Sequence, residues 1–292
     1  IHTFELYAGN LKYHQIQKTI DHLVEQRSIQ RRYSDPYSID RHLKSKYLMD
    51  EGVRMRLYQS HNKSNGISFA VTPSTLLAKC YQPLKLYRPT KANVDTLQEA
   101  LGELIKEVHL CDHEGPVVTP EELSLSRMDL TADLLKYKSA DISSLIRLFR
   151  KSMLPRHYKR GELEGKQDYF FQLATKKISF KVYDKIYELE QNDRCPKEHR
   201  KQKALRLEVS MKREAFLDRL NLNRKDDLYT MLKAGYDHIR DEINYFLDKL
   251  FPARGIHLPY PEAEKRIQEC KLDSDIKEQM LFLRKKTSRG AG

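Results

Sequence analysis

Three segments of the chain alternate between apolar and ionisable residues, and this alternation constrains the fold more than any other feature. They cover residues 125–134, 178–186 and 204–212. Successive side chains of a β-strand point to opposite faces, so each segment would direct apolar residues to a core and polar residues to the other face. The polar residues placed in this way include Arg127, Asp129, Lys181, Tyr183, Lys185, Arg206 and Glu208. The pattern predicts a sheet with one strongly ionisable face.

The other patterns predict an α+β domain followed by helices. Further strands are predicted at 1–8, 53–59, 67–71 and 168–174, and helices at 13–27, 92–108, 213–220, 226–250, 261–271 and 273–286. Asn65-Gly66 predicts a tight hairpin turn before the strand at 67–71. We expect an antiparallel sheet with helices on one face in a catalytic domain, residues 1–220. A helical extension, residues 221–292, would serve DNA specificity or interactions.

The charge of the chain favours a polyanionic partner. Its 53 Lys and Arg against 41 Asp and Glu give a net charge of +12. Residues 150–225 alone hold 21 basic and 11 acidic residues. A basic surplus of this kind suits nucleic acid. No stretch of about 18 apolar residues occurs, which argues against a membrane span. The four cysteines are scattered without a CxxC pair, as expected of reduced thiols in the cytoplasm.

A polar sheet face has a simple alternative explanation. Cross-strand ion pairs on a solvated face would produce the same alternation without any chemistry. A non-enzymatic DNA-binding protein would need only this face and basic helices to grip phosphates. An RNA-binding accessory protein is a third possibility, but the chain has no RNP, KH or OB signature.

The order of the motifs resembles that of rolling-circle replication initiators. Ser126-Arg127-Met128-Asp129 is similar to a strand of the filamentous-phage gene II/X replication proteins. Tyr183, Lys185 and Glu188, followed by Arg206-Leu207-Glu208, are similar to segments of both that group and the plasmid Rep-trans initiators. The resemblance spans roughly residues 50–220. It implies a palm like that of HUH endonucleases, although this chain has no His-x-His motif.

The resemblance implies a catalytic role for Tyr183. It would attack a phosphodiester, become linked to the 5′ phosphate and release a 3′ hydroxyl as a primer. A free phenol has a pKa of about 10 and needs activation at neutral pH. Lys181 and Lys185 on the same strand face would lower this pKa or stabilise charge on the phosphate. Asp129, Glu188 and Glu208 would supply oxygen ligands to Mg²⁺ or Mn²⁺.

Origin DNA, single-stranded or hairpin at the nick, is the expected partner. The side chains expected to contact it are Arg127, Arg156, Lys159, Arg160, Lys181 and Arg206. The loop at 156–160 mixes cations with Tyr158, which suits phosphate contact and base stacking. A host helicase and a polymerase would act with the enzyme, and oligomers are possible. A relaxase for conjugative mobilisation would use the same chemistry.

The sequence also suggests roles for three further residues near these motifs. Tyr187 follows Tyr183 by four residues, the spacing at which some initiators carry a second nucleophile; packing or DNA stacking is the alternative. Asp133 is expected to contact the residues that bind the metal and not to bind the metal itself. Asp184 points to the opposite face from Tyr183 and is expected to be structural.

Overall fold

The computed structural model describes most of residues 1–251. The described residues are 1–25, 52–58, 65–107, 111–112, 115–116, 118–135, 142–161, 169–200, 202–251, 264–265 and 268–269. Residues Ile1–Leu250 form one compact unit and Phe251–Gly292 a second. None of the described helices is long and apolar enough to cross a membrane.

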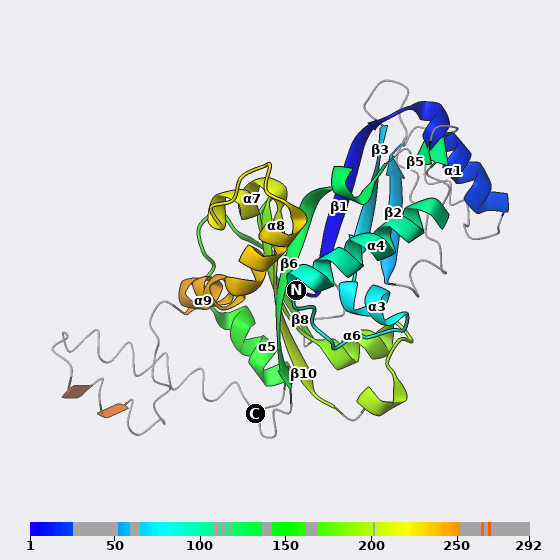
Figure 1. The fold of residues 1–292 in the computed structure, drawn as a ribbon. Coiled ribbons are helices and arrows are strands. Elements are labelled where there is room, and N and C mark those ends of the chain that lie inside the picture. The colour runs from blue at the N-terminus through cyan, green and yellow to red at the C-terminus, as the bar shows by residue number, and fades with distance from the viewer. Residues whose placement is uncertain are drawn as a thin grey trace, which may run out of the picture. The chain divides into compact units, whose positions relative to one another are not determined.

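An eight-stranded antiparallel sheet organises the first unit (Figure 1). Its order is β2-β3-β1-β6-β10-β9-β8-β7. These strands are β1 (Thr3–Leu11), β2 (Val53–Tyr58), β3 (Asn65–Val71), β6 (Ser124–Leu135), β7 (Lys159–Arg160), β8 (Phe170–Ala174), β9 (Ile178–Asp184) and β10 (Ala204–Lys212). Strands β4 (Cys111–Asp112) and β5 (Gly115–Pro116) form a separate small sheet.

Eight α-helices occur among the described residues, which confirms the α+β class and the antiparallel sheet. They are α1 (Tyr13–Glu25), α3 (Pro73–Ala78), α4 (Lys91–Glu107), α5 (Ile142–Lys151), α6 (Lys185–Gln191), α7 (Arg213–Arg219), α8 (Leu228–Asp237) and α9 (Ile239–Leu250). Short 3₁₀ turns cover Pro120–Glu122 and Lys197–His199.

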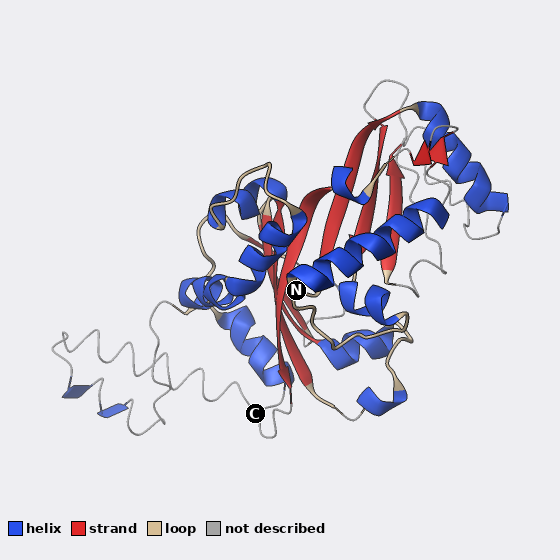
Figure 2. Cartoon of the chain, viewed as in Figure 1, coloured by secondary structure: helices blue, strands red, loops and turns tan. Residues whose placement is uncertain are grey.

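The apolar face of the sheet packs against helices, as the alternation predicts (Figure 2). Phe246 of α9 stacks on Phe180 of β9, with ring centroids 4.9 Å apart. Phe149 of α5 lies 6.3 Å from the same ring. Helix α8 comes so close to β6 that a Cβ on Gly235 would lie 2.1 Å from the Met128 sulfur. Burial of these side chains supplies the core, and the ionisable face is left to the opposite side of the sheet.

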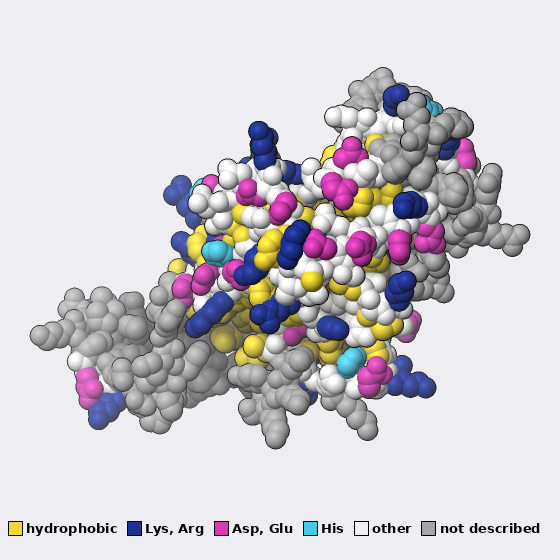
Figure 3. All heavy atoms as spheres, in the orientation of Figure 1, with side chains coloured by type: hydrophobic (Ala, Val, Ile, Leu, Met, Phe, Trp, Pro, Cys, Tyr) yellow, Lys and Arg dark blue, Asp and Glu magenta, His cyan; other side chains and the backbone are white. Residues whose placement is uncertain are grey.

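The helix-covered side shows no concentrated charge of one sign. Figure 3 shows basic and acidic side chains intermixed across it. Helix α4 contributes both kinds, with Lys91 paired to Asp95 at 2.8 Å on its exposed side. A mixed surface of this kind attracts a polyanion less than a surface of one sign would.

The structure differs from the sequence prediction of the hairpin turn. Asn65 and Gly66 are not turn residues, because they lie within β3 and pair with Leu11 and Gly9 of β1. The first compact unit extends past residue 220 to Leu250, and the roles expected of the two predicted domains stay predictions. Helices α8 and α9 belong to the first unit because their apolar residues pack against the sheet. The helices predicted at 261–271 and 273–286 lie mostly outside the described residues.

Candidate active site

The three alternating segments are neighbours in the sheet, and their register brings the predicted residues together. Strand β10 lies between β6 and β9. Arg206 of β10 is directly opposite Tyr183 of β9, and Glu208 is opposite Lys181. On the other side of β10, Ser210 is opposite Asp129 of β6. Side chains two residues apart on a strand share a face, so all of these groups lie on one surface.

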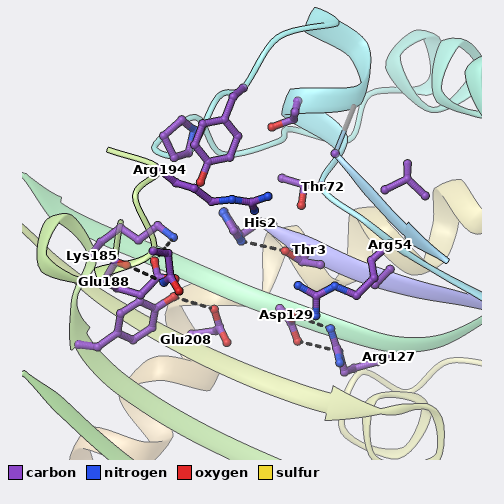
Figure 4. Close-up of a pocket in the computed structure, with 18 residues that line it drawn as sticks. His2, Thr3, Arg54, Thr72, Arg127, Asp129, Lys185, Glu188, Arg194 and Glu208 are labelled. Atoms are coloured by element: carbon purple, nitrogen blue, oxygen red, sulfur yellow. Dashed lines mark hydrogen bonds and ion pairs between the residues drawn. The ribbon is translucent and has the colours of Figure 1, made fainter. Parts of the chain in front are cut away.

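A cavity of about 540 Å³ opens on this surface (Figure 4). We call it the nucleophile cavity. Its ionisable lining residues are His2, Arg54, Arg127, Asp129, Tyr183, Lys185, Glu188, Arg194 and Glu208, with Tyr81 at its wall. Gly52 borders it with a φ of +83°, a conformation that side chains disfavour. The cavity is therefore polar and carries charges of both signs.

Tyr183 is half-buried, and its hydroxyl donates to Glu208 across 3.3 Å. Burial and the negative charge of Glu208 raise the pKa of the phenol well above its usual value. The expectation that Lys181 and Lys185 lower this pKa is not met. Lys181 lies 2.6 Å from Glu208, and Lys185 lies 2.6 Å from Glu188. Each ammonium group is therefore paired with a carboxylate, which offsets its positive charge. At neutral pH the phenol is protonated and must lose its proton during attack.

Lys185 begins α6 instead of ending a strand. Asp184 caps this helix, because its Oδ1 accepts hydrogen bonds from the backbone amides of Ile186 and Tyr187. This bears out the structural role expected of Asp184. The cap turns the chain so that Lys185 is buried at the cavity wall. Burial, together with the charge of Arg206, lowers the pKa of the Lys185 ammonium. A lysine of this kind gives up a proton more readily than one in water.

Asp129 and Glu208 form a pair of buried carboxylates. Burial and the charge of Glu208 raise the pKa of Asp129 to about 6. Burial acts to raise the pKa of Glu208 as well, but Lys181 outweighs it and lowers the value to about 2. Arg127 lies 3.3 Å from Asp129 and also 3.3 Å from Glu5, so its charge is shared. Asp129 is the less stabilised of the two carboxylates.

The residues partly fit a divalent cation. No three His, Cys, Asp or Glu side chains among the described residues form a metal-binding group. Glu188 is held by Lys185 and by Asn192, whose amide donates to Glu188 Oε1 across 3.1 Å. Asp129 Oδ1 is buried and lies 3.3 Å from Arg127 Nε as an ion pair, but it accepts no hydrogen bond from a described side chain or backbone group. Mg²⁺ commonly takes one or two carboxylates and fills its other positions with water and substrate phosphate, which Asp129 and Glu208 suit.

Arg206 does not fit the DNA-contacting role predicted for it. Its side chain is fully buried and donates from Nε and Nη2 to the two carboxylate oxygens of Asp133, both at 2.6 Å. Nη2 also donates to the Pro83 carbonyl across 3.1 Å. The alternation gave the correct face for Arg206, but the chain around Pro83 covers that face at this point. Arg206 and Asp133 therefore support the cavity from beneath.

The predicted loop contacts lie away from the nucleophile cavity. Arg156 and Lys159 are exposed, and Lys159 with Arg160 forms β7. Arg160 donates to the Ser152 carbonyl across 2.6 Å. Tyr158 is half-buried and packs edge-on against Phe246, with centroids 5.6 Å apart.

The loop lines a second hollow of about 780 Å³, which we call the basic groove. Arg156, Lys176, Lys177, Arg219 and Lys249 line it, with Glu214 and Asp218 as the acidic members. Lys177 pairs with Glu214 at 2.5 Å, and Arg219 with Glu242 at 2.7 Å. The remaining cations leave the groove positive.

The sequence interpretation missed three residues of the nucleophile cavity. Arg54 and Arg194 line it, and neither forms an ion pair with any residue that the structure describes. Arg194 lies over the Tyr81 ring, 5.8 Å from its centroid. Burial, followed by the charges of Arg206 and Lys185, lowers the pKa of His2 well below its usual value, so this imidazole is neutral. The alternation at 53–59 could have indicated Arg54, whereas no local pattern indicates Arg194.

No family model matches the chain, and a search of curated proteins found no similar protein.

Proposed function

We propose that this chain initiates rolling-circle replication by nicking and joining DNA, with Tyr183 as the nucleophile. The observation that carries the proposal is the position of the Tyr183 hydroxyl. It lies 3.3 Å from Glu208, in one cavity with Asp129 and Lys185. These groups come from β6, β9 and β10 and from α6, which directly follows β9. An HUH-like palm without the His-x-His motif is part of this proposal.

The proposed step exchanges one phosphate ester for another. Tyr183 Oη attacks the phosphorus, the bond from phosphorus to the 3′ oxygen breaks, and a 5′-phosphotyrosine and a 3′ hydroxyl result. As the new bond forms, the phenolic oxygen becomes acidic and its proton passes to the ionised Glu208. Lys185, whose pKa burial lowers, supplies a proton to the departing oxygen. A base and an acid therefore flank the nucleophile.

Two arginines of the nucleophile cavity would bind the scissile phosphate. Arg54 and Arg194 border the cavity without carboxylate partners among the described residues. Guanidinium groups match phosphate oxygens in geometry and charge, and they stabilise the charge that grows in the transition state. Asp129, together with Glu208 until it takes the proton, would hold Mg²⁺ or Mn²⁺, which when bound polarises the non-bridging oxygens. Glu188 as a further ligand stays a prediction.

DNA flanking the nick would occupy the basic groove. Ile178 at one end of β9 lines the groove and Tyr183 near the other end lines the nucleophile cavity. Five residues of strand separate them by roughly 17 Å, and this odd separation directs the two side chains to opposite faces of the sheet, so DNA that contacts both would pass around the end of β9. Tyr245, with Arg219 placed 4.2 Å over its ring, offers an aromatic surface beside the cations. The 3′ hydroxyl would prime a host polymerase, and a helicase would unwind the duplex.

Covalent adduct formation tests the proposal. Supercoiled DNA of the replicon that encodes this chain is incubated with the full protein and Mn²⁺ or Mg²⁺, then denatured. We expect open-circular DNA that carries protein, with the phosphopeptide at Tyr183 by mass spectrometry after nuclease digestion. Excess EDTA should abolish the adduct, and restored cation should recover it. DNA binding without any adduct under all these conditions would support the non-enzymatic alternative. Cleavage confined to a transfer-origin fragment would indicate a relaxase.

Cation binding should weaken as the pH falls through about 6. The raised pKa of Asp129, about 6, means that its proton competes with the cation below this pH. Each further unit should reduce the affinity for Mn²⁺ about tenfold. Electron paramagnetic resonance titrations of Mn²⁺ from pH 5 to 8 measure this, with Asp129→Asn as the variant that should lose the high-affinity site. An affinity that is constant from pH 5 to 8 would contradict the assignment of Asp129.

A further inference from the structure

A smaller hollow of about 270 Å³ lies beside Tyr183. We call it the aromatic hollow. Its rings come from Tyr169, Phe170, Tyr183 and Tyr187, and Gln191 lies at its rim. Tyr183, Glu188 and Asn192 line both this hollow and the nucleophile cavity. A molecule that places a phosphate against Tyr183 can therefore extend into the aromatic hollow.

Asp184 fixes the rings on which the hollow is built. Its backbone amide donates to the Tyr169 carbonyl across 3.1 Å, and its side chain accepts from the Tyr187 amide across 3.1 Å. The rings of Tyr169 and Tyr187 stack with centroids 3.6 Å apart and an interplanar angle of 9°. Phe170 lies across the strand pair from Tyr183, with centroids 6.2 Å apart. The two tyrosines form a face-to-face stack at a strand end, which we call the aromatic platform, and a base can lie only on an outward ring face of it.

We infer that the aromatic hollow binds the unstacked nucleobase of a nucleotide adjacent to the scissile phosphate. This inference rests on the proposed function, because it takes Tyr183 to be the residue that meets the phosphate. A base presents a flat π-face to an aromatic platform, whatever its identity. Gln191 is exposed and has no hydrogen-bond partner among the described residues, so its amide is available to the edge of a base.

The inference specifies the form of the substrate. A base that enters the hollow has left its duplex stack, so the nick site must be single-stranded or melted when it binds. It also assigns Tyr187 to stacking, the alternative to a second nucleophile. The ring of Tyr187 is held flat against Tyr169, and its role in binding needs the ring but not the hydroxyl.

Binding of two matched oligonucleotides tests the inference in the full chain. One is a 15-nucleotide oligo(dT) with a central 2-aminopurine, and the other is an abasic deoxyribose-phosphate chain of equal length. Measurements in EDTA prevent cleavage. The variants are Tyr169→Ala and Tyr187→Ala. Tyr187→Phe retains the ring, and Tyr229→Ala in α8 removes a tyrosine distant from the hollow. Near-ultraviolet circular dichroism establishes that each variant is folded.

The wild-type protein should prefer the oligo(dT) and quench 2-aminopurine fluorescence. Tyr187→Ala should weaken oligo(dT) binding by between about fivefold and 150-fold, the range found when an aromatic residue that stacks on a base is replaced by alanine. It should leave binding of the abasic chain unchanged. Tyr229→Ala should behave as wild type, and Tyr187→Phe, which keeps the ring, should keep the preference for bases. If neither alanine variant at the platform changes the preference for bases, the inference is wrong, even where Tyr183-dependent adducts form. Retained base preference in a chain that forms no adduct would instead reject the proposed function alone.

Should either platform variant fail to fold, wild-type quenching still decides the matter. Tyr187→Leu then serves as a second variant, because leucine fills space without a π-face. Equal affinity of the wild type for the two oligonucleotides, with no quenching, would overturn the inference without any variant.

Discussion

Tyr183→Phe is expected to abolish strand cleavage and adduct formation while DNA binding persists. The change removes one hydroxyl, whose hydrogen bond to Glu208 spans 3.3 Å. Glu208 keeps its contact with Lys181 at 2.6 Å, so the fold should be little affected. Loss of a nucleophile in enzymes with covalent intermediates lowers the rate by about 10⁴-fold or more. Quantification of nicked DNA and of protein–DNA adduct on denaturing gels measures the loss.

Tyr187→Phe is the matched control for this result. It removes a hydroxyl four residues further along the chain and leaves the stacked ring in place. We expect cleavage at the wild-type rate. The assignment of Tyr183 as the nucleophile would be wrong if Tyr183→Phe nicked DNA at the wild-type rate, or if Tyr187→Phe alone lost nicking.

Arg206→Met is expected to lower the free energy of unfolding by about 3–5 kcal/mol, because it leaves the carboxylate of Asp133 buried without its partner. Arg206 is 0% exposed and the Asp133 side chain 4%. Urea denaturation measures the change. The pair joins β6 to β10 and, through the Pro83 carbonyl, holds the chain that borders the nucleophile cavity. Cleavage should therefore fall as well.

A double variant separates the lost charge pairing from lost packing. Arg206→Met with Asp133→Leu removes both charges and should recover most of the stability, since an apolar pair can replace a buried ion pair at little cost. It also keeps the test informative if Arg206→Met alone does not fold. The exposed pair Lys91–Asp95 provides the contrast, and Lys91→Ala should cost less than about 1 kcal/mol. Equal midpoints for Arg206→Met and wild type would show that the pair contributes nothing.

The site also illustrates how local helix signals change a strand prediction. Residues 178–183 alternate, and the sequence prediction extends the strand to Ile186 although Asp184 interrupts the apolar side. In the structure, Asp184 accepts from two backbone amides and starts α6 at Lys185. This turn separates Lys185 from the sheet face and brings Glu188 to it at 2.6 Å. A capping residue inside an alternating run is visible in the sequence, but its competition with strand pairing is decided by neighbours.

The sequence was sufficient to predict most of the strands and the residues that share the polar face of the sheet. Alternation with a period of two is visible in each segment without knowledge of its neighbouring strands. It correctly placed Asp129, Tyr183 and Glu208 on one face. The tertiary structure alone decided what covers that face. It buried Arg206 under the chain at Pro83, and it brought Arg54 and Arg194 to the nucleophile cavity. These outcomes depend on contacts between segments far apart in the chain, and a local pattern reports the direction of a side chain but not what lies opposite it.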